Sequence, residues 1–289
     1  MRRRLLQSAI QEDIVIVEED IKAGDVAYYD GGNIKTCRLS NWDSSKGTPI
    51  GVVVVPSGFA PDGKTRIISL NGVDSSGNST TSENSMKWCS SASDTALTNY
   101  TRVPNTDNNS NSASSSGTYG YLPSDNFTST QSYVDKLAYY NYSRRLIPSP
   151  YICDTEENEA PNPAFYQEIS GYSNALSDFD GLSSTQTLVE LGSSYTAANA
   201  CWNYKDNASN LQWYLPAIGE FCYAACRQKR INETLSALGG VSICTNTQYH
   251  TATEYSSSNI YTYIIQYGAV DYYYKKTSSY YVRPFAIID

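Results

Sequence analysis

The sequence predicts an α+β fold in which a small β module precedes a larger mixed domain. Three observations lead to this prediction. Short apolar runs separated by turn residues fill the first quarter of the chain. Apolar residues recur at helical spacing between residues 188 and 238, and they alternate at the period of a strand from residue 249. The chain has 289 residues, of which 40 % are hydrophobic, so it can bury a substantial core.

The segment 12–75 has the pattern of a small β module. The run "EDIVIVEED" is an apolar strand, and a turn at 23–25 leads to a second strand from Val26 to Tyr29. The pair Gly31–Gly32 turns the chain again. "TPIGVVVV" and "KTRIISLNGV" predict two further strands, separated by the turn-rich "PSGFAPDGK".

The composition changes between Asp74 and Gly120. Its Ser- and Asn-rich tracts cannot bury a core, so we expect exposed loops around "MKWCS", with Trp88 as an apolar anchor. The segment 129–142, "STQSYVDKLAYYNY", has apolar residues at the spacing of a short helix.

Helices are predicted next. In the segment 183–205 an apolar stripe is interrupted by Gly192, which indicates two helical pieces. In the segment 213–240, Pro216 suits the first turn of a helix, and Gly239–Gly240 ends a second helical piece.

From Tyr249 the pattern is that of strands, with Gly268 at a turn or bulge. We expect these strands to pack one face on the helices and to leave the other face in water. Tyr272, Tyr273 and Tyr274 are consecutive, so they cannot all point inward.

Charge and hydropathy exclude several classes. The formal net charge is −8 and the one basic run is Arg2–Arg4, which we interpret as a solvated or anchoring N-terminus, so no nucleic-acid partner is expected. No stretch approaches the ~20 apolar residues of a membrane span. The start lacks a signal-peptide core, so we expect Met1 to begin the mature protein.

Cysteine and histidine usage argues against metal or catalytic chemistry. The seven cysteines include no CxxC, and Cys222 and Cys226 would share one face of a helix. We expect buried thiols in a reducing compartment rather than disulfides or a metal site. With a single His, at 250, we predict no enzyme, no catalytic residue and no cofactor.

A resemblance emerges from four ordered motifs: "WYLPAIGE", "INETLSALGG", "TATEYSSSN" and "YYVRPFAI". Their order and spacing resemble the C-terminal module of phage and Bacteroidetes proteins with a C-type-lectin-like fold. That group includes tail-fibre and adhesin domains and the variable proteins of diversity-generating retroelements. The resemblance covers 165–289 best. It implies an N-terminal attachment and oligomerisation module over 1–75 and a C-type-lectin-like binding domain over 76–289, with two main helices on a twisted antiparallel sheet.

The resemblance also implies structural roles. Trp213 and Leu215 would be core residues, and Glu220 would sit in the first turns of a helix. Arg283 would make a structural ion pair, and Phe285 would help to close the final strand. The family often has Trp-Ser-Ser-Thr-Glu where this chain has "HTATE", so His250 is interpreted as a packed substitute for Trp.

Calcium-dependent sugar binding by lectins of this fold uses motifs that the chain lacks. "SDFDG" places Asp178 and Asp180 two apart, as in half of a calcium loop. No further oxygen ligands follow, so we interpret the segment as a turn and predict no metal.

The tyrosine content suggests recognition. The chain has 26 Tyr against 6 Phe and 4 Trp, and Tyr with Ser and Asn enriches contact surfaces. Retroelement mutation at adenines converts AAC-type codons to the residue types that crowd the segment 249–281. We predict a solvent-facing contact surface, kept soluble by Lys275 and Lys276. Its ligand-binding residues would be Tyr255, Asn259, Tyr261, Tyr263, Tyr267, Asp271, Tyr272 and Tyr274.

The leading hypothesis is a virion-associated phage protein, a head or tail fibre, that recognises a host-surface glycan or protein. Its N-terminal module would attach to capsid or tail proteins and set a homo-oligomer, with a trimer favoured. One alternative is a bacterial cell-surface adhesin or fimbrial tip, and another is a purely structural capsid decoration protein. An enzyme of the formylglycine-generating type shares the fold, but Cys222, Cys226 and Cys244 do not match its pattern.

Overall fold

The computed structural model describes residues 21–90, 120–121, 178–206, 208–225, 227–244, 247–255, 258–264 and 269–288. It is a mixed α+β structure built mostly from antiparallel strands, which confirms the predicted class. The expected helix over 129–142, Cys153, Cys226 and Tyr267 lie outside the described residues. None of the helices in the described ranges has the length and apolar character that crossing a membrane requires.

The central sheet has six strands in the order β2-β1-β3-β4-β14-β9, all antiparallel to their neighbours. Its strands are β1 (Val26–Asp30), β2 (Asn33–Cys37), β3 (Thr48–Val55), β4 (Thr65–Ser69), β9 (Trp213–Tyr214) and β14 (Phe285–Ile288). Two short 3-10 turns, η1 (Leu39–Asn41) and η2 (Ser44–Lys46), connect β2 to β3. The final strand thus fills an interior position, between a strand from the first quarter of the chain and one from the second half.

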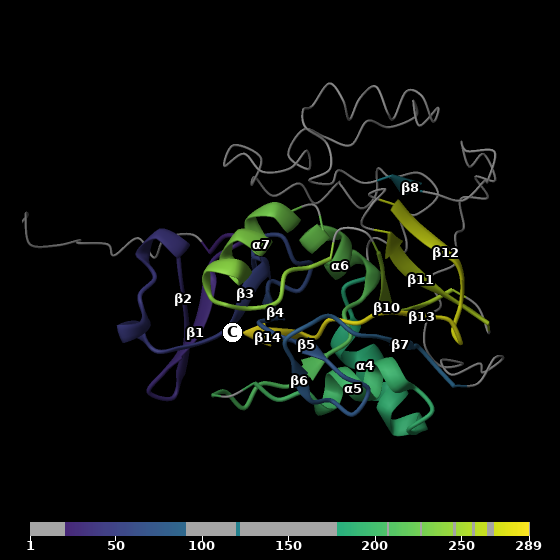
Figure 1. Ribbon diagram of the computed structural model, residues 1–289. Coiled ribbons are helices and arrows are strands. Elements are labelled where there is room, and N and C mark those ends of the chain that lie inside the picture. Colours follow the sequence, from purple (N-terminus) through teal and green to yellow (C-terminus); the bar gives the residue numbers. More distant parts are fainter. Residues whose placement is uncertain are drawn as a thin grey trace, which may run out of the picture.

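Helices cover both faces of this sheet (Figure 1). They are α4 (Gly181–Leu191), α5 (Thr196–Asn203), α6 (Ile218–Ala225) and α7 (Gln228–Ala237). Alternation along β3 divides the core between two clusters: Val52 and Val54 pack with α6 and α7, whereas Val53 packs with residues of α4 and α5. β3 and β4 are therefore buried on both sides along most of their length, whereas β2 at the edge of the sheet is partly exposed.

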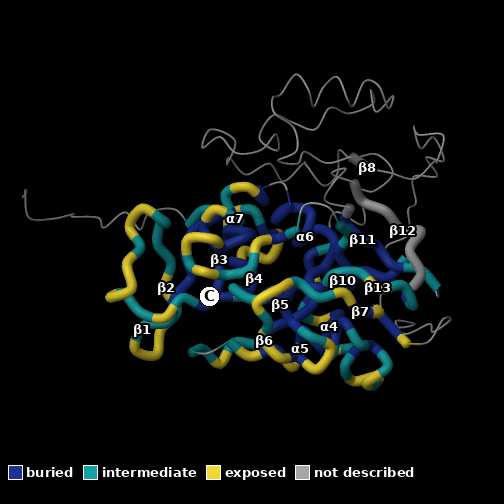
Figure 2. Tube along the Cα trace, viewed as in Figure 1, coloured by how far each residue is buried: buried dark blue, intermediate teal, exposed yellow. Residues whose placement is uncertain are grey.

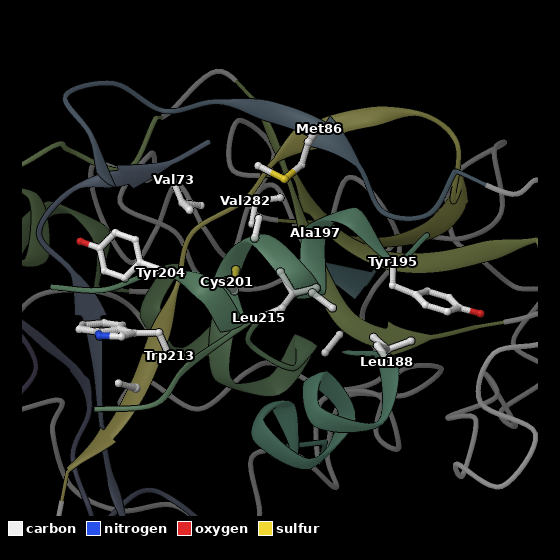
Figure 3. Close-up of a cluster of buried hydrophobic side chains, with 14 of the residues drawn as sticks. Val73, Met86, Leu188, Tyr195, Ala197, Cys201, Tyr204, Trp213, Leu215 and Val282 are labelled. Atoms are coloured by element: carbon white, nitrogen blue, oxygen red, sulfur yellow. The ribbon is translucent and has the colours of Figure 1, made fainter. Parts of the chain in front are cut away.

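The cluster on the α4–α5 side is rich in large side chains (Figure 3). Trp213 is fully buried, meets the ring of Tyr204 edge to face at 5.2 Å between ring centroids, and donates its indole N–H to Asp206 over 3.0 Å. Leu215 is buried beside it, and its backbone N–H donates to the Thr185 hydroxyl over 3.0 Å. These contacts place both residues in the core.

A second six-stranded sheet has the order β7-β13-β10-β11-β12-β8. Its strands are β7 (Ser85–Lys87), β8 (Gly120–Tyr121), β10 (Gln248–Glu254), β11 (Asn259–Ile264), β12 (Ala269–Lys275) and β13 (Ser279–Tyr281). The pair β10–β13 is parallel and the other pairs are antiparallel. A small hairpin of β5 (Gly72–Val73) and β6 (Ser79–Thr80) lies apart from both sheets in the pairing.

Local breaks follow the sequence. Gly192 separates α4 from α5 with a φ of +127°, and Gly239 ends the region of α7 with a φ of +72°, both in the range that favours glycine. The β1–β2 hairpin turns through Gly31 and Gly32, as predicted. Mostly exposed polar residues between β5 and β7 precede Trp88 in the chain, and its buried indole donates to the Thr251 carbonyl over 2.9 Å.

The described part of the segment 1–75, predicted to be an N-terminal β module, packs against the rest of the chain. β4 pairs with β14 from Phe285↔Ile68 to Ile288↔Thr65. The Thr234 hydroxyl on α7 donates to the Gly24 carbonyl over 2.6 Å. Within this segment, Figure 2 shows exposed residues in the β1–β2 hairpin and its connections, while most of β3 and β4 is buried. Residue 75 therefore marks no break in the sheet.

The expectation that the strands after Tyr249 leave one face in water is wrong for β10 and β11. Residues 249–254 and 260–263 are all buried. On one side, Tyr249 and Tyr263 pack on Phe221 of α6, with ring centroids 4.9 and 6.0 Å from that of Phe221. On the other side, Ile260 belongs to the cluster that contains Trp88. β10 and β11 are therefore covered on both faces, by one core cluster on each side.

Candidate functional site

The candidate site is the β11–β12 hairpin, defined as residues 259–275, which carries most of the predicted contact residues. The backbone register pairs Tyr263 with Val270, Thr262 with Asp271 and Ile260 with Tyr274, with an irregularity between residues 260 and 262. On its other side, β12 pairs with β8 at residues 269 and 270. In Figure 1 the hairpin lies at the opposite end of the molecule from β1 and β2.

Two of the predicted contact residues are core residues. Tyr261 and Tyr263 are fully buried, so the prediction that they present their rings to a ligand is wrong. The two-residue period of β11 puts both on the face that packs towards α6. Tyr263 packs on Phe221, and the carbonyl of Tyr261 accepts a hydrogen bond from the Thr251 hydroxyl over 2.7 Å. They hold the hairpin on the core.

The other predicted contact residues fall into two groups. Tyr255 and Asn259 are partly exposed at the β10–β11 connection, where the Tyr255 N–H donates to the Asn259 carbonyl over 3.1 Å. The Tyr255 ring meets Tyr261 edge to face at 5.5 Å between centroids. Asp271, Tyr272 and Tyr274 belong to β12, whose backbone course is described.

A buried ion pair supports the base of the hairpin. Lys276 and Glu254 are both fully buried and pair with each other, and the Lys276 ammonium lies 4.9 Å from the centroid of the Trp88 ring. The expectation that Lys276 keeps the surface soluble is therefore wrong. A buried carboxylate and the ring face offset the desolvation of the ammonium, which explains why a lysine is tolerated here.

His250 is a buried residue of β10 in the same sheet. Its Nε2 lies 2.9 Å from the Met86 carbonyl and 3.2 Å from that of Ser278. Both partners accept only, so Nε2 carries a proton. Burial lowers the pKa of His250 to about 4. A fully buried, neutral imidazole held by two carbonyls is suited to packing.

Glu220 is the centre of a buried polar network that joins the helices to the sheet. Its carboxylate accepts from Arg66 Nε over 2.8 Å, from the Tyr214 hydroxyl over 2.9 Å and from the Ala217 N–H over 2.7 Å. The contact with Ala217 caps the first turn of α6, where a carboxylate complements the helix dipole. Burial raises the pKa of Glu220 to about 7.

Arg66 satisfies all of its donors in this network. Besides Glu220, its guanidinium donates to both oxygens of Asp62 and to the carbonyls of Lys64 and Phe179. Sequence reasoning missed Arg66, which interrupts the apolar run of β4. A charged residue at a predicted core position was the available signal, because such a residue needs a buried partner.

Arg283 and Phe285 fix the end of the chain to the core. Arg283 is fully buried and pairs with Glu83 over 2.6 Å, while its guanidinium also donates to the carbonyls of Ser69 and Val241. Burial raises the pKa of the Glu83 carboxyl. Phe285 stacks on Phe221 at 6.0 Å between centroids. Both residues are fully buried, so their role is structural.

Asp178 has a structural use in the loop before α4. Its carboxylate accepts from the Thr253 hydroxyl over 2.7 Å and from the Asp180 N–H over 3.0 Å. Burial raises the pKa of Asp178. Over the ranges that the structure describes, no group of three or more His, Cys, Asp or Glu side chains is arranged to hold a metal ion.

Comparison with known proteins yields one likeness. No family model and no curated protein matches the chain. A solved structure, that of a fimbrial protein from Bacteroides ovatus ATCC 8483, is similar over 93 % of this chain and 49 % of its own, with 16 % sequence identity and a TM-score of 0.40. The chain therefore spans about half the length of that protein. A likeness at this level carries no argument about what the chain binds.

Proposed function

We propose that the chain is a ligand-binding protein of a surface assembly, that it has a C-type-lectin-like architecture, and that the β11–β12 hairpin contacts a host-surface glycan or protein. One observation carries the proposal: β12, the strand of the hairpin that contains Tyr272, Tyr273 and Tyr274, pairs directly with β11, which is buried on both faces. A rigid frame lowers the entropy lost when a ligand binds, and Tyr adds contact area with few torsions to immobilise.

The C-type-lectin-like part of the proposal is supported by where the four motifs fall. They form β9 and α6, α7, β10, and the β13–β14 segment, and all of these contribute to the cluster around Phe221. Segments that resemble one group in order and spacing thus also share one core. Such agreement between local motifs and long-range packing is what a common fold requires.

The binding role is tested with purified protein on intact bacterial cells and on an array of cell-surface glycans. The test variant carries Tyr272→Ser and Tyr274→Ser together. The control is Tyr29→Ser, a partly exposed tyrosine on β1 at the other end of the molecule. We expect the double variant to lose at least tenfold in affinity and the control to bind as the wild type does, since a few aromatic residues dominate such interfaces.

Circular dichroism of both variants shows whether each remains folded. Equal binding by a folded double variant and the wild type would remove the hairpin from the proposal. If the double variant binds normally but fails to assemble into particles, the structural decoration alternative takes its place.

The carrier of the protein separates the remaining alternatives. Mass spectrometry of purified phage particles and of bacterial outer-surface fractions locates the chain. Presence in particles supports the fibre reading, and presence in the surface fraction supports the adhesin reading. Light scattering of the purified chain measures whether it forms the expected trimer.

A further inference from the structure

Arg227 occupies an unusual place at the junction of α6 and α7. Its guanidinium lies 4.0 Å from the centroid of the Tyr223 ring and 5.6 Å from that of Phe59. The two rings are tilted against each other, with centroids 5.2 Å apart. Arg227 is 5 % exposed, while Phe59, in the loop between β3 and β4, is only partly buried. The cation is thus held beside two aromatic rings, of which Phe59 is partly exposed.

Among the residues that the structure describes, this arginine has no anionic partner. No carboxylate of the described residues lies within ion-pair distance of it, and its buried Nη1 donates no hydrogen bond. The two other deeply buried arginines, Arg66 and Arg283, each pair with a carboxylate. Ring faces stabilise a guanidinium by only ~0.5–2 kcal/mol, whereas an unpaired buried charge costs several kcal/mol. The site therefore lacks an anion.

The adjacent helix end favours the same sign of ligand. Arg227 is the N-cap residue of α7, its side chain makes no capping hydrogen bond, and the first turn contains no acidic residue. The first N–H groups of a helix are oriented towards anions and carry the positive end of its dipole. Lys229 and Arg230 follow in the same turn, so the segment "RQKR" concentrates positive charge in a chain of net charge −8.

We propose that Arg227 binds the carboxylate of an acidic sugar, with the partly exposed ring of Phe59 against the C–H face of that sugar. A guanidinium binds a carboxylate through paired N–H donors, and an aromatic ring beside it suits a flat apolar sugar face. This anion site lies at the α6–α7 junction, apart from the β11–β12 hairpin, and it does not depend on the function proposed for the hairpin.

The test measures binding of trigalacturonic acid by isothermal titration calorimetry and by the rise in melting temperature. The comparison probes are its uncharged methyl ester, a capped glutamate peptide and inorganic phosphate. We expect the wild type to bind the acid and to bind the ester at least tenfold more weakly. The variant Arg227→Met should lose at least tenfold in affinity for the acid, and Phe59→Ala should also weaken binding.

Matched variants separate a binding role from a structural one. Lys229→Gln removes one positive charge from an exposed position in the same turn and should keep most of the affinity. Arg227→Met should melt at the same temperature as the free wild type or higher, because an apolar side chain replaces an unpaired charge. If Arg227→Met fails to fold, Arg227→Lys keeps the charge, loses the planar donor pair, and should still bind the acid more weakly than the wild type.

Three results would overturn the proposal. One is the absence of binding to the acid. Another is equal binding of the acid and its methyl ester. The third is binding of only the peptide or only phosphate, which would assign the site to a different anion.

Discussion

Replacing His250 with Gln is expected to remove the fall in the free energy of unfolding at low pH that the protonation of His250 causes. The folded protein holds His250 neutral with a pKa of about 4, against 6.5 in the unfolded chain. As pH falls from 6.5 to 4, the unfolded state takes up this proton before the folded state does. Stability is therefore full above pH 6.5 and is lost across that window.

The size of the effect follows from the two pKa values. A separation of about 2.5 pH units corresponds to about 3 kcal/mol. Glu220 acts in the opposite direction, because its raised pKa of about 7 favours the folded state as pH falls from 7 towards 4.5. The difference between wild type and variant cancels that contribution and isolates His250.

The assay is urea unfolding of wild type and His250→Gln at pH 7, 6, 5 and 4. The Nε2 of Gln can donate to the Met86 and Ser278 carbonyls, so the variant should be near the wild type in shape. Between pH 7 and pH 4, the wild type should lose about 3 kcal/mol more of its free energy of unfolding than His250→Gln does. The control is Tyr280→Phe, whose ring meets His250 edge to face at 5.1 Å. Parallel curves for wild type and His250→Gln would refute the reasoning.

Three further outcomes are expected. Glu220→Gln should cost about 3–5 kcal/mol in urea unfolding, because it breaks the fully buried pair with Arg66 and leaves that guanidinium the more exposed Asp62 as its carboxylate; a loss below about 1 kcal/mol would contradict this. Tyr263→Ser should cost about 3–5 kcal/mol in the same assay, and Tyr255→Ser should cost less since Tyr255 is only partly buried; the reverse order would show that the ring of Tyr263 is not a core residue. Gly51→Ala should cost about 2 kcal/mol or more by thermal unfolding, since its added Cβ would lie 2.4 Å from the Ile68 carbonyl oxygen, and an unchanged melting temperature would exclude that clash.

Features set by a few neighbouring residues could be predicted from the sequence. Three such features are the break at Gly192, the end of the helix near Gly239 and the hairpin at Gly31. Each needs a positive φ, which glycine adopts readily, so the glycine in the sequence indicates the feature. The apolar character of β3 likewise indicates a strand covered on both faces.

Pairings between distant segments could not be predicted in this way. β4 pairs with β14, and the sequence of neither strand identifies the other as its partner. The same limit applies to single charges: Lys276 looks like a solvated lysine until Glu254 and the Trp88 ring are beside it.

For the candidate site, the alternation in the sequence places Tyr261 and Tyr263 on one face of a strand. It does not tell which layer covers that face. The core of α6 does so, and the two residues became anchors instead of contacts. Arg227 could not be singled out from the sequence, because the sequence does not tell which carboxylates lie near it in the folded protein.

The interior position of β14 has a consequence for how the chain reaches its native state. β4 and β9 flank a gap that only residues 285–288 can fill, so the central sheet cannot close until residues 70–284 have been made and brought into place. Contacts of such long sequence separation slow folding. During synthesis the nascent chain exposes two unpaired strand edges, which are sites of aggregation. Loss of the last few residues should therefore prevent folding altogether, and dependence on a chaperone during translation is the expected cellular signature.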